Sequence, residues 1–249
     1  GNFEDKIKMA KDISEALKSG KNPAPNTVGL TDEKMNKIKG VFKILKNRNN
    51  IKKVYFLRCD NMNFILASAS ERRQELLKRI VKDFSVMVSE FDEDIVKKTG
   101  SVSEYVQEIA LGKAKDIMNK VNEDSIIIAA DTVVSLDEKI LGKPKNYKEA
   151  YDMLHSLSNN EHKVYTGVIV INTKTKVILK DAVETKVFFS NLSSDEINSY
   201  IETGDPFDKA GAYGIQGMAG VFVEKIEGCY YNVVGLPLNR LNKMIKKVY

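Results

Sequence analysis

A single carboxylate interrupts one of the most apolar stretches of the chain. Residues 126–134 read IIIAADTVV, so Asp131 carries the one charge in this run. Burying an unpaired charge costs several kcal/mol, so Asp131 should be paired, bound to a metal, or placed at the exposed end of a strand. Ligands of open α/β sheets collect at the carboxyl ends of strands, which favours a functional role. The alternative is a core aspartate satisfied by backbone amides.

A segment further upstream joins small residues to two arginines. Residues 66–77 read LASASERRQELL, which indicates a strand followed directly by a helix. Ser70 can cap that helix, whose first backbone N–H groups would suit a phosphate. Arg72 and Arg73 offer guanidinium groups for bidentate phosphate contacts, and a bound anion would explain cations at a helix N-terminus. An ordinary helix cap with two solvated arginines is the alternative.

Two lysines and an acidic stretch are further candidates. Lys113 falls in the apolar stripe of a helix predicted over 103–121, so it either snorkels to the edge or points inward toward a phosphate. Lys143 lies in the sequence LGKP, which is not a P-loop because G-x-x-x-x-G-K-[ST] occurs nowhere in the chain. The stretch 89–94, SEFDED, is either a source of a magnesium ligand or a solvated loop.

The elements that must position these residues alternate between strands and helices, which predicts an α/β fold. Hydrophobic periodicity and turn residues predict both kinds of element. The predicted strands are 64–68, 125–134, 164–171, 177–189 (one strand or a pair), 220–226 and 232–234. The predicted helices start after Ser70, at 103, at 149, after a capping box of Ser193 with Glu196, and near the C-terminus.

Residues 1–60 are predicted to form a separate, basic unit of two amphipathic helices, followed by a main domain over 61–249. The first sixty residues carry 14 Lys/Arg against 7 Asp/Glu, whereas the remainder carries 25 against 27. Solvated Lys/Asn-rich helix faces explain this charge, and a surface for nucleic acid or an acidic membrane is the alternative. Nucleic acid is the less favoured partner, because the basic residues are not interleaved with aromatic ones.

The bulk composition indicates an ordinary globular protein. Hydrophobic residues make up 43% of the 249 residues, and no apolar run approaches the length of about 20 residues that spans a bilayer. No signal peptide is apparent at the N-terminus. Two cysteines, Cys59 and Cys229, indicate reduced thiols and a cytoplasmic location. Two isolated histidines argue against a structural zinc site.

From about residue 63 to the C-terminus, the chain resembles the Maf family of nucleotide pyrophosphatases. The matching segments read LASASERRQELL, SEFDE, EIALGKAK, AADTVV, LGKP, HKVYTG, DPFDKAGAYGIQG and YYNVVGLPL. The resemblance implies a twisted mixed sheet with flanking helices and two lobes around a deep cleft, in a family whose members are often homodimers. It also implies hydrolysis of a nucleoside triphosphate between its α and β phosphates. The last two segments are similar to the branch that prefers dTTP and UTP, in which Arg72, Thr132 and Gln216 would mark the preference.

The resemblance assigns roles that agree with the chemistry of the residues. Asp131 would be catalytic, as a general base or as a ligand of Mg²⁺ or another divalent cation, with Glu93 as a second carboxylate near that metal. Gln216 would read the edge of a pyrimidine. The phosphate-neutralising cations would be Arg72, Arg73, Lys113 and Lys143, with Ser68 and Ser70 contacting the phosphates.

The chain departs from the family pattern at two positions. Glu71 replaces a common proline, and Cys229 stands where serine is usual. The N-terminal unit has no counterpart in the family. A nucleotide- or nucleic-acid-binding regulator that docks through this basic unit is therefore the competing hypothesis, and it predicts salt-dependent binding that needs residues 1–60.

Overall fold

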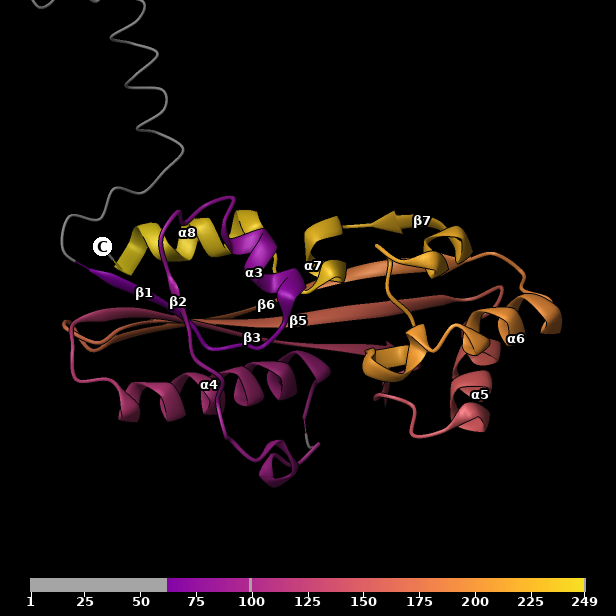
Figure 1. Cartoon of the computed structure of the whole chain (residues 1–249), viewed down its shortest axis with the longest axis horizontal. Helices are drawn as coiled ribbons and strands as arrows, with labels where there is room; N and C mark the ends of the chain where they lie inside the picture. The colour runs from indigo at the N-terminus through magenta and orange to yellow at the C-terminus, as the bar shows by residue number, and fades with distance from the viewer. Residues whose placement is uncertain (1–61, 99, 249) are drawn as a thin grey trace, which may run out of the picture. The chain divides into compact units, whose positions relative to one another are not determined.

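The computed structural model of the protein describes residues 62–98 and 100–248. The helices expected within residues 1–60 lie outside this range. In the described part, seven strands form one mixed sheet in the order β2-β1-β3-β5-β6-β7, with β4 paired to β3 (Figure 1). The strands are β1 (Asn63–Leu66), β2 (Ser85–Val86), β3 (Ser125–Leu136), β4 (Lys139–Leu141), β5 (Glu161–Asn172), β6 (Val177–Phe189) and β7 (Val223–Glu227). The predicted α/β class with a mixed sheet is confirmed.

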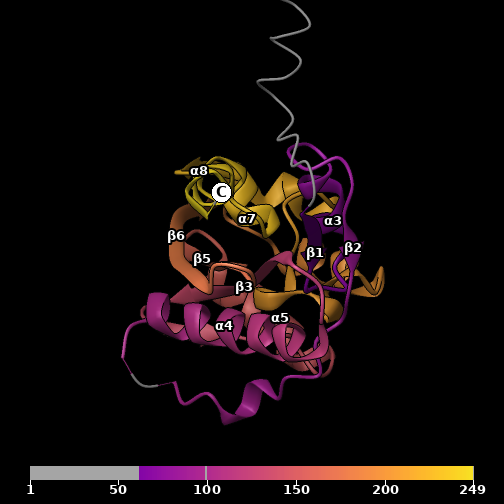
Figure 2. The ribbon, with the colours of Figure 1, turned by 90° about the vertical axis from the view of Figure 1, so that its left-hand side faces the viewer.

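Helices cover both faces of this sheet. The helices are α3 (Glu71–Leu77), α4 (Val102–Lys120), α5 (Tyr147–Leu157), α6 (Ser194–Glu202), α7 (Tyr230–Val234) and α8 (Leu238–Val248). The helix α4 lies against one face, whereas α3 and α8 lie against the other (Figure 2). Short 3₁₀ turns complete the described elements: η2 (Glu93–Ile95), η3 (Asp205–Asp208), η4 (Ala210–Ala212) and η5 (Met218–Phe222).

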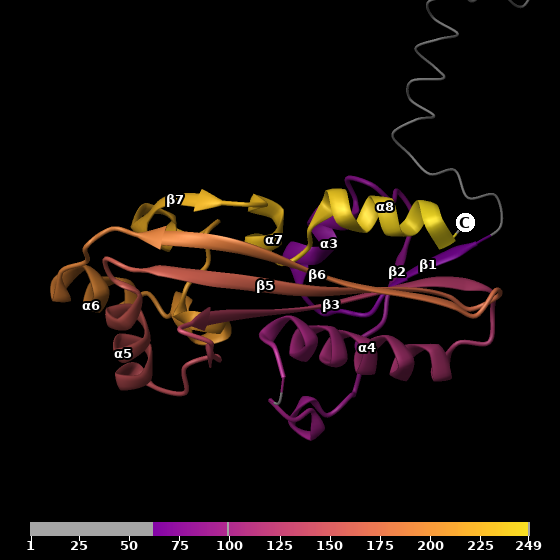
Figure 3. The same ribbon diagram turned by 180° about the vertical axis from the view of Figure 1, so that it is seen from behind.

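Strand residues alternate between the two faces, so β3 supplies two cores at once. Ile127 and Ala129 pack toward α4, whereas Ile126 and Ile128 pack toward α3 and α8. A third core lies at the other end of the sheet, where α5 and α6 pack on the ends of β5 and β6 (Figure 3). Residues 62–98 and 100–248 thus form two packed lobes joined by the long strands β3, β5 and β6.

A close approach fixes the position of α4. A Cβ atom on Gly167 of β5 would overlap the backbone of Val106 and Gln107 in α4, so the absence of a side chain lets helix and strand touch. The helix begins at a capping box, in which Ser101 and Glu104 each bond the backbone of the other. The close approach at Gly167 holds α4 near β5, and Lys113 lies about two turns beyond Val106 on this helix.

Most predicted elements are present, but two predictions need correction. Residues 220–222, predicted to begin a strand, belong to the 3₁₀ turn η5, so that strand starts at Val223. Residues 232–234, predicted as a strand, belong to the helix α7. A short apolar run does not distinguish strand from helix, and here the buried Asn232 side chain donates to Val164 O and Thr185 Oγ1, while Gly235 at φ 121° ends the turn. Residues 177–189 form one strand rather than a pair. No helix of the described residues is long and apolar enough to cross a membrane.

Candidate active site

The site forms at a gap in the pairing of β3. One edge of β3 pairs with β1 as far as Ile128 and with β4 from Val134 onward, which leaves residues 129–133 without a strand on that side among the described elements. Asp131 and Thr132 lie in this gap. Asp131 is therefore in the middle of β3, close to the point where β1 ends, rather than at the end of its own strand.

A cavity of about 470 Å³ opens at this gap, within the size range of small-molecule sites. Side chains from both lobes line it. The sequence-predicted residues among them are Ser70, Arg72, Arg73, Glu93, Lys113, Asp131, Thr132, Lys143 and Gln216. The remaining one, Ser68, lines an adjoining cavity of about 520 Å³ that shares seven residues with the first. The structure therefore brings all of these residues to one cleft, while their roles stay predictions.

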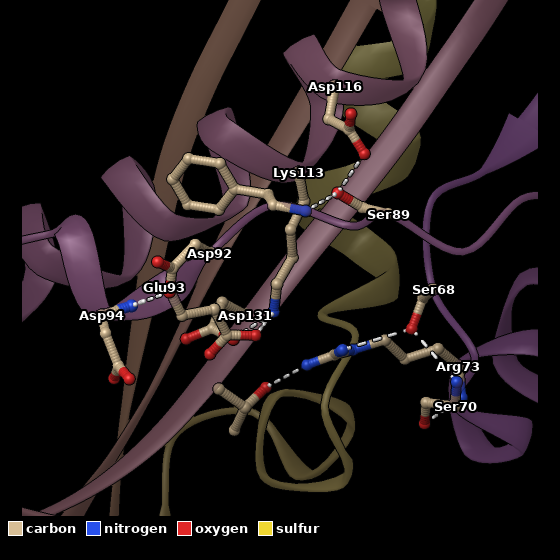
Figure 4. A network of polar contacts seen from close by, with 12 residues as sticks. Ser68, Ser70, Arg73, Ser89, Asp92, Glu93, Asp94, Lys113, Asp116 and Asp131 are labelled. Atoms are coloured by element: carbon tan, nitrogen blue, oxygen red, sulfur yellow. Dashed lines mark hydrogen bonds and ion pairs between the residues drawn. The ribbon is translucent and has the colours of Figure 1, made fainter. Parts of the chain in front are cut away.

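Asp131 is paired with Lys113 at the floor of the cavity. Lys113 Nζ lies 2.8 Å from Asp131 Oδ1 and 2.8 Å from Glu93 Oε1 (Figure 4). Asp131 is only 7% exposed, so Lys113 points inward and supplies the charge partner that a buried aspartate requires. The pKa of the nearby Tyr105 is raised, first by burial and then by the negative charges of Asp131 and Glu93.

The segment that carries Glu93 is anchored to α4 at two more points. Asp116 accepts hydrogen bonds of 2.8 Å from Ser89 Oγ and from the Glu90 backbone N–H (Figure 4). Phe91 lies on Gly112, where a Cβ atom would overlap its ring. The acidic stretch is thus anchored to α4 although its four carboxylate side chains are exposed, and Glu93 lies beside Lys113.

Arg73 is a central hydrogen-bonding residue of the cleft wall. Its Nε donates to the carbonyl oxygen of Gly235 at 2.9 Å, and its Nη2 donates to Thr132 Oγ1 at 3.0 Å. Its Nη1 donates to Ser68 Oγ at 3.4 Å. Burial lowers the pKa of Arg73, and the charge of Asp131 opposes this effect. Three of its five N–H groups are used, so two are left for a ligand.

Ser68 and Ser70 both stabilise the start of α3. Ser70 Oγ accepts from the Arg73 backbone N–H at 3.4 Å, which confirms the predicted helix cap. Ser68 Oγ accepts from the Ser70 backbone N–H at 3.2 Å. Glu71, the first residue of α3, is exposed and lines the adjoining cavity rather than the one that contains Asp131.

A charged cluster that was not predicted from the sequence lies on the opposite wall. Lys209 Nζ donates to Asp205 Oδ1 at 2.9 Å, to the Asp205 carbonyl oxygen at 2.7 Å and to Asp208 Oδ1 at 2.7 Å. Burial alone would raise the pKa of Asp205, but the hydrogen bonds from Lys209 and from the Tyr200 hydroxyl hold it below its usual value, and Arg72 contributes to the lowering. The signal was the i,i+4 pair of Asp205 with Lys209 within the segment DPFDKAGAYGIQG.

Lys209 supports the loop that carries Gln216. All three of its N–H groups have acceptors, so it has none left for a phosphate. Its methylene groups lie beneath Gly214, where a Cβ atom would meet Lys209 Cδ and Cε at 2.9 Å. Arg72 and Lys143, by contrast, are exposed, and no hydrogen bond or salt bridge is found for either side chain within residues 62–98 and 100–248.

The lining charges leave one net positive charge. Five cations face four carboxylates, the latter being Glu93, Asp131, Asp205 and Asp208. A triphosphate brings more negative charge than this, so a divalent cation bound together with the substrate would complete the neutralisation. No group of three or more acidic, histidine or cysteine side chains in the described chain could hold a metal ion by itself. Glu93 and Asp131 nevertheless reach the same ammonium group, and two carboxylates with substrate phosphates are a usual Mg²⁺ environment.

Comparison with known proteins gives consistent matches over this region. Residues 63–248 match the family model described as Maf-like protein. A protein named dTTP/UTP pyrophosphatase from Clostridium botulinum (strain Alaska E43 / Type E3) is 60% identical over 186 residues, which cover 75% of this chain and 99% of that protein. A protein of the same name from Clostridium beijerinckii (strain ATCC 51743 / NCIMB 8052) is 58% identical over 187 residues, or 75% and 100% of the two chains. A solved structure, the Staphylococcus aureus Ham1 protein, aligns with a TM-score of 0.40 and 16% identity over 75% of this chain and 100% of that chain.

Proposed function

The chain belongs to the Maf-like protein family, and from that premise we propose that it hydrolyses nucleoside triphosphates to a monophosphate and pyrophosphate, with dTTP and UTP preferred. The observation that carries this proposal is a buried carboxylate, Asp131, at the floor of a cavity that also presents Arg72 and Lys143. A polyphosphate would bind to the cations, and the carboxylate would act on the water that attacks it.

In the proposed reaction, the oxygen of a water molecule forms a bond to the α phosphorus. The bond between that phosphorus and the oxygen bridging to the β phosphorus breaks, and pyrophosphate leaves with the bridging oxygen. Asp131 accepts the proton that the water loses, which contributes about 10²–10⁴ in rate for a positioned general base. Its ion pair with Lys113 orients this carboxylate before substrate arrives.

The other cleft residues would bind and orient the substrate. Lys113 has one N–H group beyond those used by Asp131 and Glu93, and Arg73 has two, so both can add a phosphate contact without losing their partners. Arg72 and Lys143 would supply the remaining positive charge. When bound, Mg²⁺ would neutralise phosphate charge, and Glu93 and Asp131 are the side chains that would hold it.

Gln216 and Thr132 would set the preference for pyrimidines, including modified ones, since both line the cavity on opposite lobes. The regulator hypothesis depends on residues 1–60, and nothing in the described residues favours it. A homodimer and a cytoplasmic location stay predictions.

The test is a panel of ordinary and modified triphosphates with Mg²⁺, in ¹⁸O-labelled water, with products resolved by mass. We expect monophosphate and pyrophosphate, fastest from dTTP and UTP, with the label in the monophosphate because water attacks the α phosphorus. EDTA should abolish turnover and added Mg²⁺ should restore it. Absence of pyrophosphate release from every substrate would refute the proposal, and a labelled pyrophosphate would refute the site of attack.

A further inference from the structure

A chain of hydrogen bonds starts at Arg73 on the cavity wall and runs inward through Thr132 and Thr166 to the backbone of Asn232. Arg73 Nη2 lies 3.0 Å from Thr132 Oγ1 on β3, and Thr132 Oγ1 lies 2.9 Å from Thr166 Oγ1 on β5. Thr166 Oγ1 lies 2.9 Å from the carbonyl oxygen of Asn232 in α7. Thr166 and Asn232 are completely buried, so water cannot substitute for a missing partner.

The ends of this chain fix the direction of every proton in it. A backbone carbonyl only accepts, so Thr166 must donate its single hydroxyl proton to Asn232. Thr166 then has no proton for Thr132, so Thr132 must donate to Thr166. The guanidinium of Arg73 only donates, and its N–H therefore meets a lone pair of Thr132.

Thr132 is consequently an acceptor toward the cavity. Its proton is donated to Thr166, and one of its two lone pairs accepts from Arg73. The second lone pair can accept a hydrogen bond from a ligand in the cavity. Thr132 has no proton to give to a phosphate oxygen. Without Thr166, the Thr132 proton loses its acceptor, so the hydroxyl is free to rotate and its lone pair is held less firmly toward Arg73.

We propose that Thr166, although it does not line the cavity, is a positioning residue for the proposed hydrolysis. Its hydroxyl accepts the hydrogen bond that Thr132 donates, and this keeps a Thr132 lone pair directed at the Arg73 guanidinium, which is thereby held in place. This inference rests on the proposed function for its kinetic consequence and on the hydrogen-bond geometry for its structural one. The charged hydrogen bond to Thr132, together with that to Gly235, determines where the two unused N–H groups of Arg73 point.

The test compares three variants. Thr166→Val removes the hydroxyl at nearly constant volume, and Thr166→Ser retains it. Thr173→Val is the matched control. Thr173 is also a buried threonine, and its hydroxyl accepts a hydrogen bond of 2.8 Å from the Ser125 backbone N–H. It lies just beyond the end of β5 that is far from the cavity. We expect kcat/KM for dTTP to fall about 10- to 100-fold in Thr166→Val, as misplaced binding groups do, and to stay within about twofold of wild type in Thr166→Ser and Thr173→Val. Equal kinetics for Thr166→Val and Thr173→Val would overturn the inference.

A second measurement does not depend on turnover. Arg73 and Thr166 share Thr132 as a partner, so their effects on the urea unfolding midpoint should be non-additive in the cycle of Arg73→Met, Thr166→Val and the double variant. Additive shifts would overturn the inference. If the wild-type protein releases no pyrophosphate, the proposed function fails. The cycle of unfolding midpoints then decides by itself whether the hydrogen bonds through Thr132 and Thr166 hold Arg73 in place.

Discussion

Replacing Asp131 with asparagine tests the proposed chemistry most directly, because the change removes a charge and a proton acceptor at nearly constant shape. The cavity would then hold five cations against three carboxylates, so its net positive charge rises from one to two. Binding of a polyanion should therefore not weaken. A loss of activity would have to come from the chemical step rather than from attraction of the substrate.

The expected effect is a kcat lowered by about 10²–10⁴ with a KM that is unchanged or reduced, equivalent to about 3–5 kcal/mol of transition-state stabilisation. The fold should survive. Lys113 keeps Glu93 at 2.8 Å, and the amide oxygen at position 131 can still accept from it, so the cost should be about 1–2 kcal/mol rather than the larger penalty of a buried charge left alone.

The assay is steady-state pyrophosphate release from dTTP, with unfolding in urea measured on the same preparations. Asp181→Asn is the matched control, since Asp181 is also an ion-paired aspartate on a strand, 2.8 Å from Arg240, but it does not line the cavity. A Mg²⁺ titration separates the two roles of Asp131: excess Mg²⁺ would rescue a lost ligand but not a lost base. Full turnover in Asp131→Asn would show that the proposed mechanism is wrong even for a correct family assignment.

Three further changes test the supports of the site. Gly112→Ala should lower the unfolding free energy by about 1–3 kcal/mol, because the added methyl group overlaps the Phe91 ring, and adding Phe91→Ala should recover part of the loss in urea unfolding. Burial lowers the pKa of His162 to about 4, so between pH 6.5 and 4 the unfolded chain binds a proton that the folded chain does not. The free energy of unfolding should therefore fall as the pH falls through this range. In urea titrations, His162→Gln should remove about 3 kcal/mol of the loss between pH 7 and pH 4. Lys209→Met should raise the KM for dTTP about tenfold while kcat changes less, because the Gln216 loop loses its support and two carboxylates lose their partner; an unchanged KM would contradict this role.

Local sequence was sufficient to predict the elements that have a long hydrophobic pattern or a clear helix cap. The helix α4 has sustained periodicity, α6 has its capping box, and the apolar run of β3 is too long to be misread. The strand prediction for residues 232–234 is wrong because three apolar or amide residues carry no usable period. The helical turn depends on a buried amide bonded to Val164 and Thr185, which are far away in the sequence.

The sequence by itself determined which groups could handle a polyphosphate: a carboxylate in an apolar strand, paired arginines after a strand, and lysines at unusual positions. It left open whether the Lys113 side chain extends to solvent at the edge of its helix or points inward. It also predicted the same phosphate-binding role for Arg73 and Arg72. Only the tertiary structure separated these cases. Lys113 forms its ion pair with Asp131 because Gly167 lets α4 pack directly on β5. Arg73 donates hydrogen bonds to Thr132 and to Gly235, which lies 162 positions along the chain. Hydrogen-bond partners of this kind depend on where distant backbone segments come to lie, and no spacing within one segment encodes that.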